Sequence, residues 1–433
     1  MLSARPVDGR FRSLRSIVNA VLVAILFAVP WVRIDGEPLV LLDIAARRFH
    51  VAGLVIFPQE LYLLWLLVIG LAIALFFFTT LAGRLWCGWA CPQTVFTDVF
   101  AGIARRVEGW KGFTRPKRVA PWRRVALHAV WLAACIAIGF HLVGYFHSPY
   151  AMLHEIRTGS LSSMTVGLWT VATAVAYADF VFVRQTFCKY LCPYARFQGV
   201  MFDRDTLVVG YDTRRGEPRG KRAQGDCVDC GLCVAVCPTG IDIRDGLQLE
   251  CITCTQCIDE CDGVMAKLGR APSLIGYRAL ASLEGQRPAR LLRPRVLVYA
   301  AMLAAIVVGF GAALAQREPL DLQVIRNRAE LFQTAADGRA SNAFTLHIQN
   351  RARMPRSFVV ALEGSPGFEL VAGMNPVSVD ATDEVETRVF VLAPLGSDVG
   401  ADGREIRFTI EATDDARARV ERPARFLARR STG

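Results

Sequence analysis

Eight cysteines between Cys227 and Cys261 constrain the fold of this chain more than any other feature. They form two runs of identical spacing, Cys227, Cys230, Cys233 and Cys237, then Cys251, Cys254, Cys257 and Cys261. This is the spacing of bacterial two-cluster ferredoxins, in which the fourth cysteine of each run binds the other cluster. It predicts one [4Fe-4S] cluster held by Cys227, Cys230, Cys233 and Cys261, and a second held by Cys251, Cys254, Cys257 and Cys237.

A disulfide cage and a zinc site are the alternatives for these thiols, and the doubled spacing argues against both. The two runs differ in one turn, because the first ends in Cys237-Pro238 and the second in Cys261-Asp262. The set of eight ligands is nevertheless complete. We therefore expect a ferredoxin-like domain.

Long apolar runs indicate a membrane protein. The chain has 433 residues, of which 53% are hydrophobic, and a mean hydropathy of +0.33. The excess lies in five runs, which we interpret as membrane spans, at about residues 17–32, 61–81, 125–146, 161–187 and 296–315. The fifth run, of about twenty residues, has the length of one bilayer crossing. The first run also resembles a signal peptide, but the sequence from Pro30 to Arg33 is a poor cleavage site.

Basic residues predict the orientation of these spans. Nine Lys and Arg residues lie from Arg84 to Arg124, whereas the loops after the first and third spans hold few. By the positive-inside rule, the N-terminus, this basic loop and the ferredoxin region are cytoplasmic, and the tail after the fifth span is periplasmic. The net charge of +11 thus reflects membrane topology, and we expect no nucleic-acid partner.

The C-terminal tail has a different sequence pattern. Polar and apolar residues alternate at 343–349 and in parts of 384–393 and 404–412, with Gly, Pro and Asp between these segments. Short strands at this spacing predict a small immunoglobulin-like β-sandwich, with another small β-fold as the alternative. We expect four regions: four spans in 1–200, a ferredoxin-like domain and linker in 201–294, a fifth span in 295–316, and the sandwich in 317–433.

Four further cysteines form two matching Cys-x-x-x-Cys-Pro motifs, Cys87 with Cys91 and Cys188 with Cys192. On a helix, thiols four residues apart share one face, and the following proline suits the first turn of a new helix. Both motifs follow spans that run in the same direction, so the four thiols are expected to meet at the cytoplasmic surface. Soft thiolates suit Cu(I) and redox exchange; a further cluster, or simple packing at a helix end, remains open.

Other candidate ligands give weaker signals. Cys135 is alone within the third span and is expected to pack there. His128, His141, His147 and His154 lie in or near the same span, but no pairing at matching depth favours haem, and only His141 and His147 lie near the outer end, where copper could enter. No Gly-x-Gly-x-x-Gly motif follows a predicted strand, so a separate electron donor is expected.

With these motifs in place, the chain resembles the CcoG family, also called FixG or RdxA, the cytochrome c oxidase accessory proteins. The resemblance is carried by residues 87–98, 188–198, 205–212, 215–220 and 238–246, and it extends from about residue 57 to about residue 277. The tail is similar to the immunoglobulin-like domain of that family. Residues 273–277 differ from the basic sequence that is usual at this place in the family, which leaves the role of this linker open.

The resemblance implies an iron–sulfur protein of the bacterial inner membrane that acts in assembly of cbb3-type cytochrome c oxidase. The implied reaction is reduction of Cu(II) to Cu(I) at Cys87, Cys91, Cys188 and Cys192, for delivery through a copper chaperone or copper-transporting ATPase. The alternative is a non-catalytic electron conduit or scaffold, similar to ferredoxin-type membrane subunits, that serves a partner reductase. A redox sensor is disfavoured, because no signalling or DNA-binding module is visible.

Overall fold

We describe the protein from a computed structural model. The structure describes residues 4–34, 36–112, 114, 116, 118–283, 290–327, 332–335, 337–364, 366–395, 403–415 and 418–428. The chain divides into two compact units, Met1–Gly311 and Ala312–Gly433. The first unit contains the apolar helices and all thirteen cysteines, and the second contains the β-rich tail.

Within the described residues, five helices are long and apolar enough to cross a membrane, as expected. They are centred on α1 (Arg10–Ala28), α2 (Leu61–Ala82), α5 (Pro121–Gly144), α7 (Ser163–Tyr177) and α13 (Pro294–Ala315). α1 and α5 begin earlier than the apolar runs, because Arg and Trp residues extend their first turns. Of the nine basic residues used for orientation, Arg115 and Lys117 lie outside the described residues.

The fourth span ends in an irregular segment. After α7 the chain continues as the π-helical η3 (Ala178–Val183), breaks at Arg184 with φ 53°, and resumes as the π-helical η4 (Phe187–Leu191). The span is therefore not continuous to residue 187. π-helical turns often occur at functional sites, and here they precede and contain Cys188.

Shorter elements join the spans. The loop between α1 and α2 contains β1 (Arg33–Ile34), β2 (Glu37–Pro38), and a small antiparallel sheet of β3 (Val40–Asp43), β4 (Arg48–Val51) and β5 (Leu54–Ile56). After α2 come α3 (Leu85–Trp89) and α4 (Pro92–Glu108), and α6 (Pro149–Thr158) precedes α7. α8 (Pro193–Met201) leads into the ferredoxin region. Proline occupies the first helical position of α4, α5, α6 and α8, where its missing N–H is not needed.

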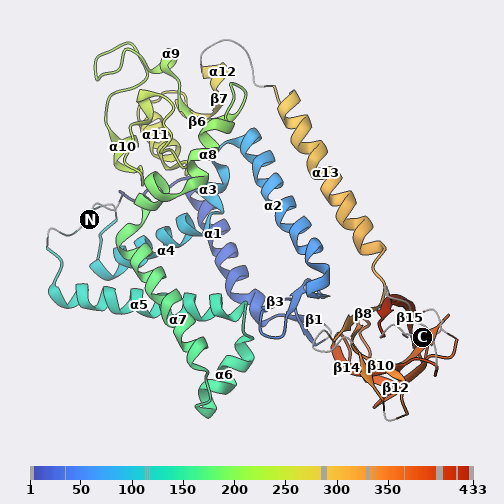
Figure 1. Ribbon diagram of the computed structural model, residues 1–433. Helices are drawn as coiled ribbons and strands as arrows, with labels where there is room; N and C mark the ends of the chain where they lie inside the picture. Colours follow the sequence, from blue (N-terminus) through green and yellow to red (C-terminus); the bar gives the residue numbers. More distant parts are fainter. Residues whose placement is uncertain are drawn as a thin grey trace. The chain divides into compact units, whose positions relative to one another are not determined.

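The ferredoxin region packs around the cysteine loops. Its elements are β6 (Leu207–Tyr211), α9 (Thr213–Gly216), α10 (Leu232–Ala235), α11 (Gln256–Lys267), β7 (Ile275–Ala279) and α12 (Leu280–Leu283). β6 pairs antiparallel with β7, so residues 273–277, whose role was open, enter a strand that closes the domain (Figure 1). Asp259 of α11 accepts hydrogen bonds from the backbone N–H groups of Phe11 and Arg12, at 3.1 and 2.7 Å. The Asp259 carboxylate therefore lies at the N-terminus of α1 and joins this helix to the ferredoxin region.

The tail is the predicted β-sandwich. In its described part, one sheet has the order β12 (Glu369–Ala372), β14 (Glu384–Leu392), β10 (Ala340–Asn350) and β8 (Leu320–Arg326), with β9 (Gln333–Thr334) also paired to β10. The other has the order β13 (Val377–Val379), β11 (Arg356–Glu363), β15 (Arg404–Ala412) and β16 (Arg419–Phe426). Alternate residues of both sheets meet in a core that contains Phe344, Phe358 and Phe408, all fully buried.

Candidate metal centres

The two cysteine runs fold into matching loops with left-handed residues at equivalent places. Asp229 (φ 54°) and Gly231 (φ 66°) precede and follow Cys230, while Thr253 (φ 57°) and Thr255 (φ 65°) do so for Cys254. A left-handed conformation is uncommon for a β-branched threonine, so the loop has to hold it in place. These turns curl each Cys-x-x-Cys-x-x-Cys segment so that its three thiols lie on one side.

The first three cysteines of the first run and the last cysteine of the second run line one cavity. Its wall contains Cys227, Cys230, Cys233 and Cys261, which we call the first cysteine cavity. Apolar residues of β7 and α11, including Ile275 and Met265, close it together with Arg244. Arg244 is held by Asp242 and Asp229, with shortest N–O distances of 2.5 Å to each.

A second cavity is lined by the other four cysteines. Cys251, Cys254, Cys257 and Cys237 surround it, and we call it the second cysteine cavity. Cys233 also reaches its wall, so the two cavities adjoin. Cys230 of the first cavity is exposed to solvent, whereas all four cysteines of the second cavity are at least partly buried.

The residues present fit iron–sulfur clusters. Each cavity is surrounded by four cysteines, and none of the thirteen cysteines forms a disulfide. Among the described residues, no three His, Cys, Asp or Glu side chains gather closely enough to hold a single metal ion. In a [4Fe-4S] cube each thiolate binds a different iron, so its ligands surround a volume instead of converging on one point.

Burial keeps the free thiols neutral. It raises the pKa of Cys233 to about 11 and the pKa values of Cys254 and Cys261 to about 12, and neighbouring thiols act in the same direction. A nearby cation opposes the shift in two cases, Arg244 at Cys233 and Arg15 at Cys254. Metal binding at these thiols therefore has to release protons.

The two Cys-x-x-x-Cys-Pro motifs come together in space. Cys87 interacts electrostatically with Cys91, Cys188 and Cys192, and we call these four the four-thiol group. Burial first, then the Cys91 thiol, raises the pKa of Cys87 to about 12; burial also raises the pKa of Cys188 to about 11. Cys87 donates a hydrogen bond to Oε1 of Gln198 at 3.2 Å.

Neither motif is a continuous helix, in contrast to the expectation that its two thiols share a helix face. Cys87 lies in α3 and Cys188 in the π-helical η4, but Cys91 and Cys192 are N-caps with extended backbone, ahead of α4 and α8. The prolines do begin new helices at both places. The two thiols of each motif nevertheless interact electrostatically, Cys91 with Cys87 and Cys192 with Cys188.

The four-thiol group adjoins the second cysteine cavity. Cys87, Ile252 and Cys254 form one buried cluster, against which Cys188 packs. A Cβ atom on Gly88 would lie 2.4 Å from the carbonyl oxygen of Ile252, so only glycine permits this approach of α3 to the cysteine loop. Three proposed metal-binding groups therefore follow one another, from the exposed first cavity to the four-thiol group near the membrane.

Two buried arginines beside this junction were not identified from the sequence as site residues. Arg15, 1% exposed, donates to the carbonyl oxygen of Gly88 at 2.6 Å and pairs with Asp98 at 2.9 Å. Arg84, 3% exposed, donates to the carbonyl of Ala195 and acts electrostatically on Cys87 and Cys251. Arg84 belongs to the basic loop that predicts the membrane topology, and a charge at the edge of an apolar run can also mark a buried site.

The histidines stay apart from these centres. Nδ1 of His128 lies 2.7 Å from the Tyr177 hydroxyl, and Nε2 of His141 accepts from Trp31 at 3.1 Å. His147 faces Glu155 at 3.1 Å. Cys135 is fully buried in the core between α4, α5 and η3 and serves packing.

The regions that match known protein families correspond to the membrane-span, ferredoxin and sandwich regions of the chain. Residues 183–280 match a 4Fe-4S dicluster domain, residues 63–111 a 4Fe-4S binding domain, and residues 310–429 the immunoglobulin-like fold at the C-terminus of FixG. The methylamine utilization ferredoxin-type protein MauN of Methylorubrum extorquens is 28% identical over 39% of this chain and 53% of its own length.

Two relatives match over nearly the whole length. Protein RdxA of Cereibacter sphaeroides is 40% identical over 91% of this chain and 89% of its own length. The nitrogen fixation protein FixG of Rhizobium meliloti is 35% identical over 90% of this chain and 86% of its own length. With its candidate membrane spans, iron–sulfur domains and immunoglobulin-like tail, this chain belongs to the FixG/RdxA family of membrane iron–sulfur proteins.

Proposed function

We propose that this protein reduces Cu(II) to Cu(I) at the four-thiol group, using electrons from two [4Fe-4S] clusters. Cys227, Cys230, Cys233 and Cys261 would hold one cluster, and Cys251, Cys254, Cys257 and Cys237 the other. When bound, such clusters supply single electrons, at potentials between roughly −700 and +450 mV. A separate cytoplasmic or membrane donor would reduce the protein.

The residues of the four-thiol group suit copper as a substrate. One electron converts Cu(II) to Cu(I), and soft thiolates favour the product. Since no three described thiols gather closely enough to hold one ion, two thiolates of the group would hold the Cu(I) ion. Cys91 and Cys192 are partly exposed and could receive the ion, whereas Cys87 is buried. The Gln198 amide beside Cys87 would fix the direction of its sulfur atom. Bound thiolates carry negative charge, and the guanidinium of Arg84 nearby offsets part of it.

One observation carries the proposal. Cys87 of the four-thiol group and Cys254 of the second cysteine cavity belong, with Ile252, to one buried cluster. Water is excluded from this contact, and no mobile carrier is needed between the two groups of thiols. Electrons delivered to the second cavity would have the four-thiol group as a neighbour.

The wider role is proposed from the family. In this role, the protein lies in the bacterial inner membrane, with the N-terminus and the ferredoxin region in the cytoplasm and the sandwich in the periplasm. The Cu(I) product would pass to a copper chaperone or copper-transporting ATPase and serve assembly of cbb3-type cytochrome c oxidase.

A competition titration with a Cu(I) chelator tests the site. We expect the wild type and Cys135→Ala to retain Cu(I), because Cys135 lies apart from the group. The variant with Ser at positions 87, 91, 188 and 192 should lose this Cu(I) while keeping the same iron content. Equal Cu(I) retention by all three proteins would contradict the assignment.

The match of residues 63–111 to a 4Fe-4S binding domain favours a second candidate. In this alternative the four-thiol group holds a further iron–sulfur cluster, and the protein is an electron conduit for a partner reductase. The same Ser variant separates the two functions, because its iron content would then fall by the iron of one cluster. Unchanged iron content excludes this alternative.

A further inference from the structure

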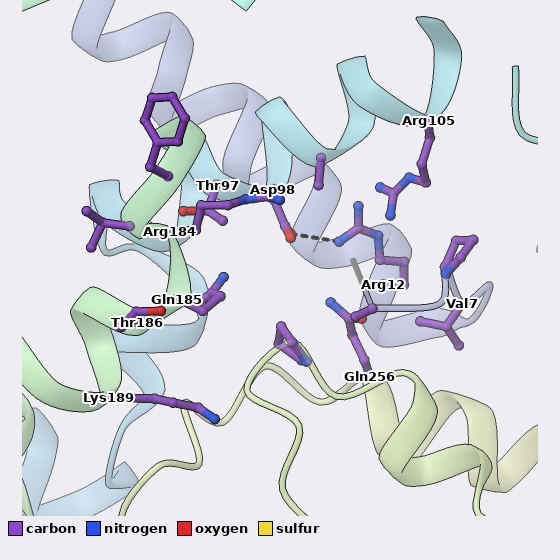
Figure 2. A pocket seen from close by; sticks show the side chains of 16 residues that line it. Val7, Arg12, Thr97, Asp98, Arg105, Arg184, Gln185, Thr186, Lys189 and Gln256 are labelled. Carbon is purple, nitrogen blue, oxygen red and sulfur yellow. Dashed lines mark hydrogen bonds and ion pairs between the residues drawn. The ribbon is translucent and has the colours of Figure 1, made fainter. Parts of the chain in front are cut away.

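A cavity of about 300 Å³ lies beside the second cysteine cavity and takes no part in the proposed copper reaction. Its walls come from four parts of the first unit: the N-terminal segment before and within α1, the helix α4, the end of the fourth span, and the ferredoxin loops (Figure 2). Pro238, which follows Cys237, and Gln256, which precedes Cys257, form its ferredoxin side. This volume is at the lower end of the range of small-molecule sites.

The cavity is strongly cationic. Arg12, Arg105, Arg184 and Lys189 line it, whereas Asp98 is the only acidic residue among the described residues of its wall. Figure 2 shows Arg12 and Arg105 on one side and Lys189 on the other. Asp98 is already engaged, because it pairs with Arg12 at 2.7 Å and with the buried Arg15 at 2.9 Å.

The other three cations form no ion pair with any side chain in the described part of the chain. Burial lowers the pKa of Arg105 and of Arg184, and at Arg105 the neighbouring Arg12 adds to the effect. Asp98 opposes this shift at Arg105 and Glu108 opposes it at Arg184, but neither carboxylate forms an ion pair with these guanidinium groups. Withdrawing a guanidinium from water without a close partner is unfavourable. An anion in the cavity would remove this penalty.

Neutral polar groups complete the lining. The Thr186 hydroxyl can donate a hydrogen bond, whereas the Thr97 hydroxyl already donates to the carbonyl oxygen of Gln93 at 2.6 Å. Guanidinium groups match phosphate oxygens in paired hydrogen bonds, which makes arginine the preferred residue for phosphate recognition. The excess of positive charge also opposes entry of a copper ion from this side.

We propose that this cavity binds the phosphate group of a small anionic ligand, either the headgroup of an anionic phospholipid or a soluble phosphate compound. Phe182 and Val183, at the end of the fourth span, also line it and would allow a lipid chain to continue into the membrane. A ligand in the cavity contacts residues adjacent to Cys237 and Cys257, so occupancy is coupled to the loops of the second cysteine cavity.

Binding can be measured on the full-length protein in phosphatidylcholine nanodiscs, with inorganic pyrophosphate as the soluble probe. Retention of phosphatidylglycerol, counted by mass spectrometry after extraction from phosphatidylglycerol nanodiscs, is the lipid arm. The variant Arg105→Gln/Arg184→Gln removes two unpaired cations. Arg124→Gln is the matched control, because Arg124 is an exposed arginine in the first turn of α5 and does not line the cavity.

We expect one of the two probes to bind the wild type and the Arg124→Gln control equally, and the double variant at least roughly tenfold more weakly. Pyrophosphate binding would identify a soluble compound, and phosphatidylglycerol retention a lipid. The proposal is overturned if neither probe distinguishes the double variant from the wild type. If the double variant does not fold, Lys189→Gln decides: several-fold weaker binding supports the site, and unchanged binding rejects it. None of these readouts depends on copper reduction.

Discussion

Gly88 leaves no room for a side chain between α3 and the loop that carries Cys251 and Cys254. The carbonyl oxygens of Ile252 and Thr253 would lie 2.4 and 2.7 Å from an added Cβ atom. Both are backbone atoms and cannot move aside as a side-chain tip can. At this residue the proposed copper site and the second cysteine cavity are held together.

Gly88→Ala should therefore separate the two sites. We expect a loss of about 1–3 kcal/mol in stability from overpacking, and slower copper reduction. Gly102→Ala is the control, because an added Cβ on this α4 glycine meets nothing within 4 Å; alanine there should be neutral or stabilise by roughly 0.5–1 kcal/mol. Thermal unfolding and the initial rate of Cu(I) formation measure both effects. Equal behaviour of the two variants would show that the contact at Gly88 is unimportant.

Arg15 should set the redox potential at the second cysteine cavity. This buried cation acts electrostatically on Cys254 and favours the more negative, reduced state of a bound cluster. In Arg15→Gln we expect the midpoint potential to fall by on the order of 60 mV, which is tenfold in the one-electron equilibrium constant. Arg10→Gln, at an exposed arginine of α1, is the control. A redox titration followed by EPR in which both variants match the wild type would refute this role.

At the residue scale, the sequence predicted which cysteines form the candidate sites, but it did not predict the polar residues that lie beside them in the structure. The spacing of the cysteine runs, and the repetition of the Cys-x-x-x-Cys-Pro motif, mark the thiols themselves. Arg15, Arg84 and Gln198 could not be found in the same way, because each acts on a residue far away in the chain. Sequence spacing carries information on local contacts, and these three contacts are long-range.

At the element scale, hydrophobic length predicted the five spans well but did not predict irregular backbone. The second span matches α2 to within one residue, whereas the fourth breaks at Arg184 after a π-helical segment. Composition gives the length of an apolar run, but the hydrogen-bonding pattern within it depends on packing. The pairing of β6 with β7 was likewise hidden, because about sixty residues of cysteine loops and helices lie between the strands.

The sandwich should depend on its own core and not on iron. Phe408 is fully buried against Phe344, with ring centroids 5.1 Å apart. We expect Phe408→Ala to cost this unit about 3–5 kcal/mol. Val359→Ala, at a position 42% exposed on β11, should change the free energy of unfolding of this unit by less than about 1 kcal/mol. Proteolysis of the tail reports its stability, and iron content should stay at the wild-type level in both variants. A loss of iron in Phe408→Ala would mean that the two units depend on each other.

At the scale of the whole molecule, the orientation in the membrane determines on which side the cysteine loops lie. Our proposal puts the cysteine loops in the cytoplasm and the sandwich in the periplasm. A cysteine replacing the exposed Ser378 should then react with an impermeant maleimide in intact cells, whereas one replacing the exposed Lys221 should react only after lysis. Wild-type protein provides the background from the native thiols. The reverse pattern of labelling would invert the topology.

Stoichiometric electron transfer to copper tests the central claim most directly. The purified, cluster-loaded protein is reduced with dithionite under anaerobic conditions, freed of excess reductant and mixed with Cu(II), while a chelator reports Cu(I) and absorbance reports cluster oxidation. We predict that Cu(I) appears in proportion to cluster oxidation in the wild type, and that this reaction is lost when Cys87, Cys91, Cys188 and Cys192 are replaced by Ser. Clusters that stay reduced in the presence of Cu(II) would contradict the account.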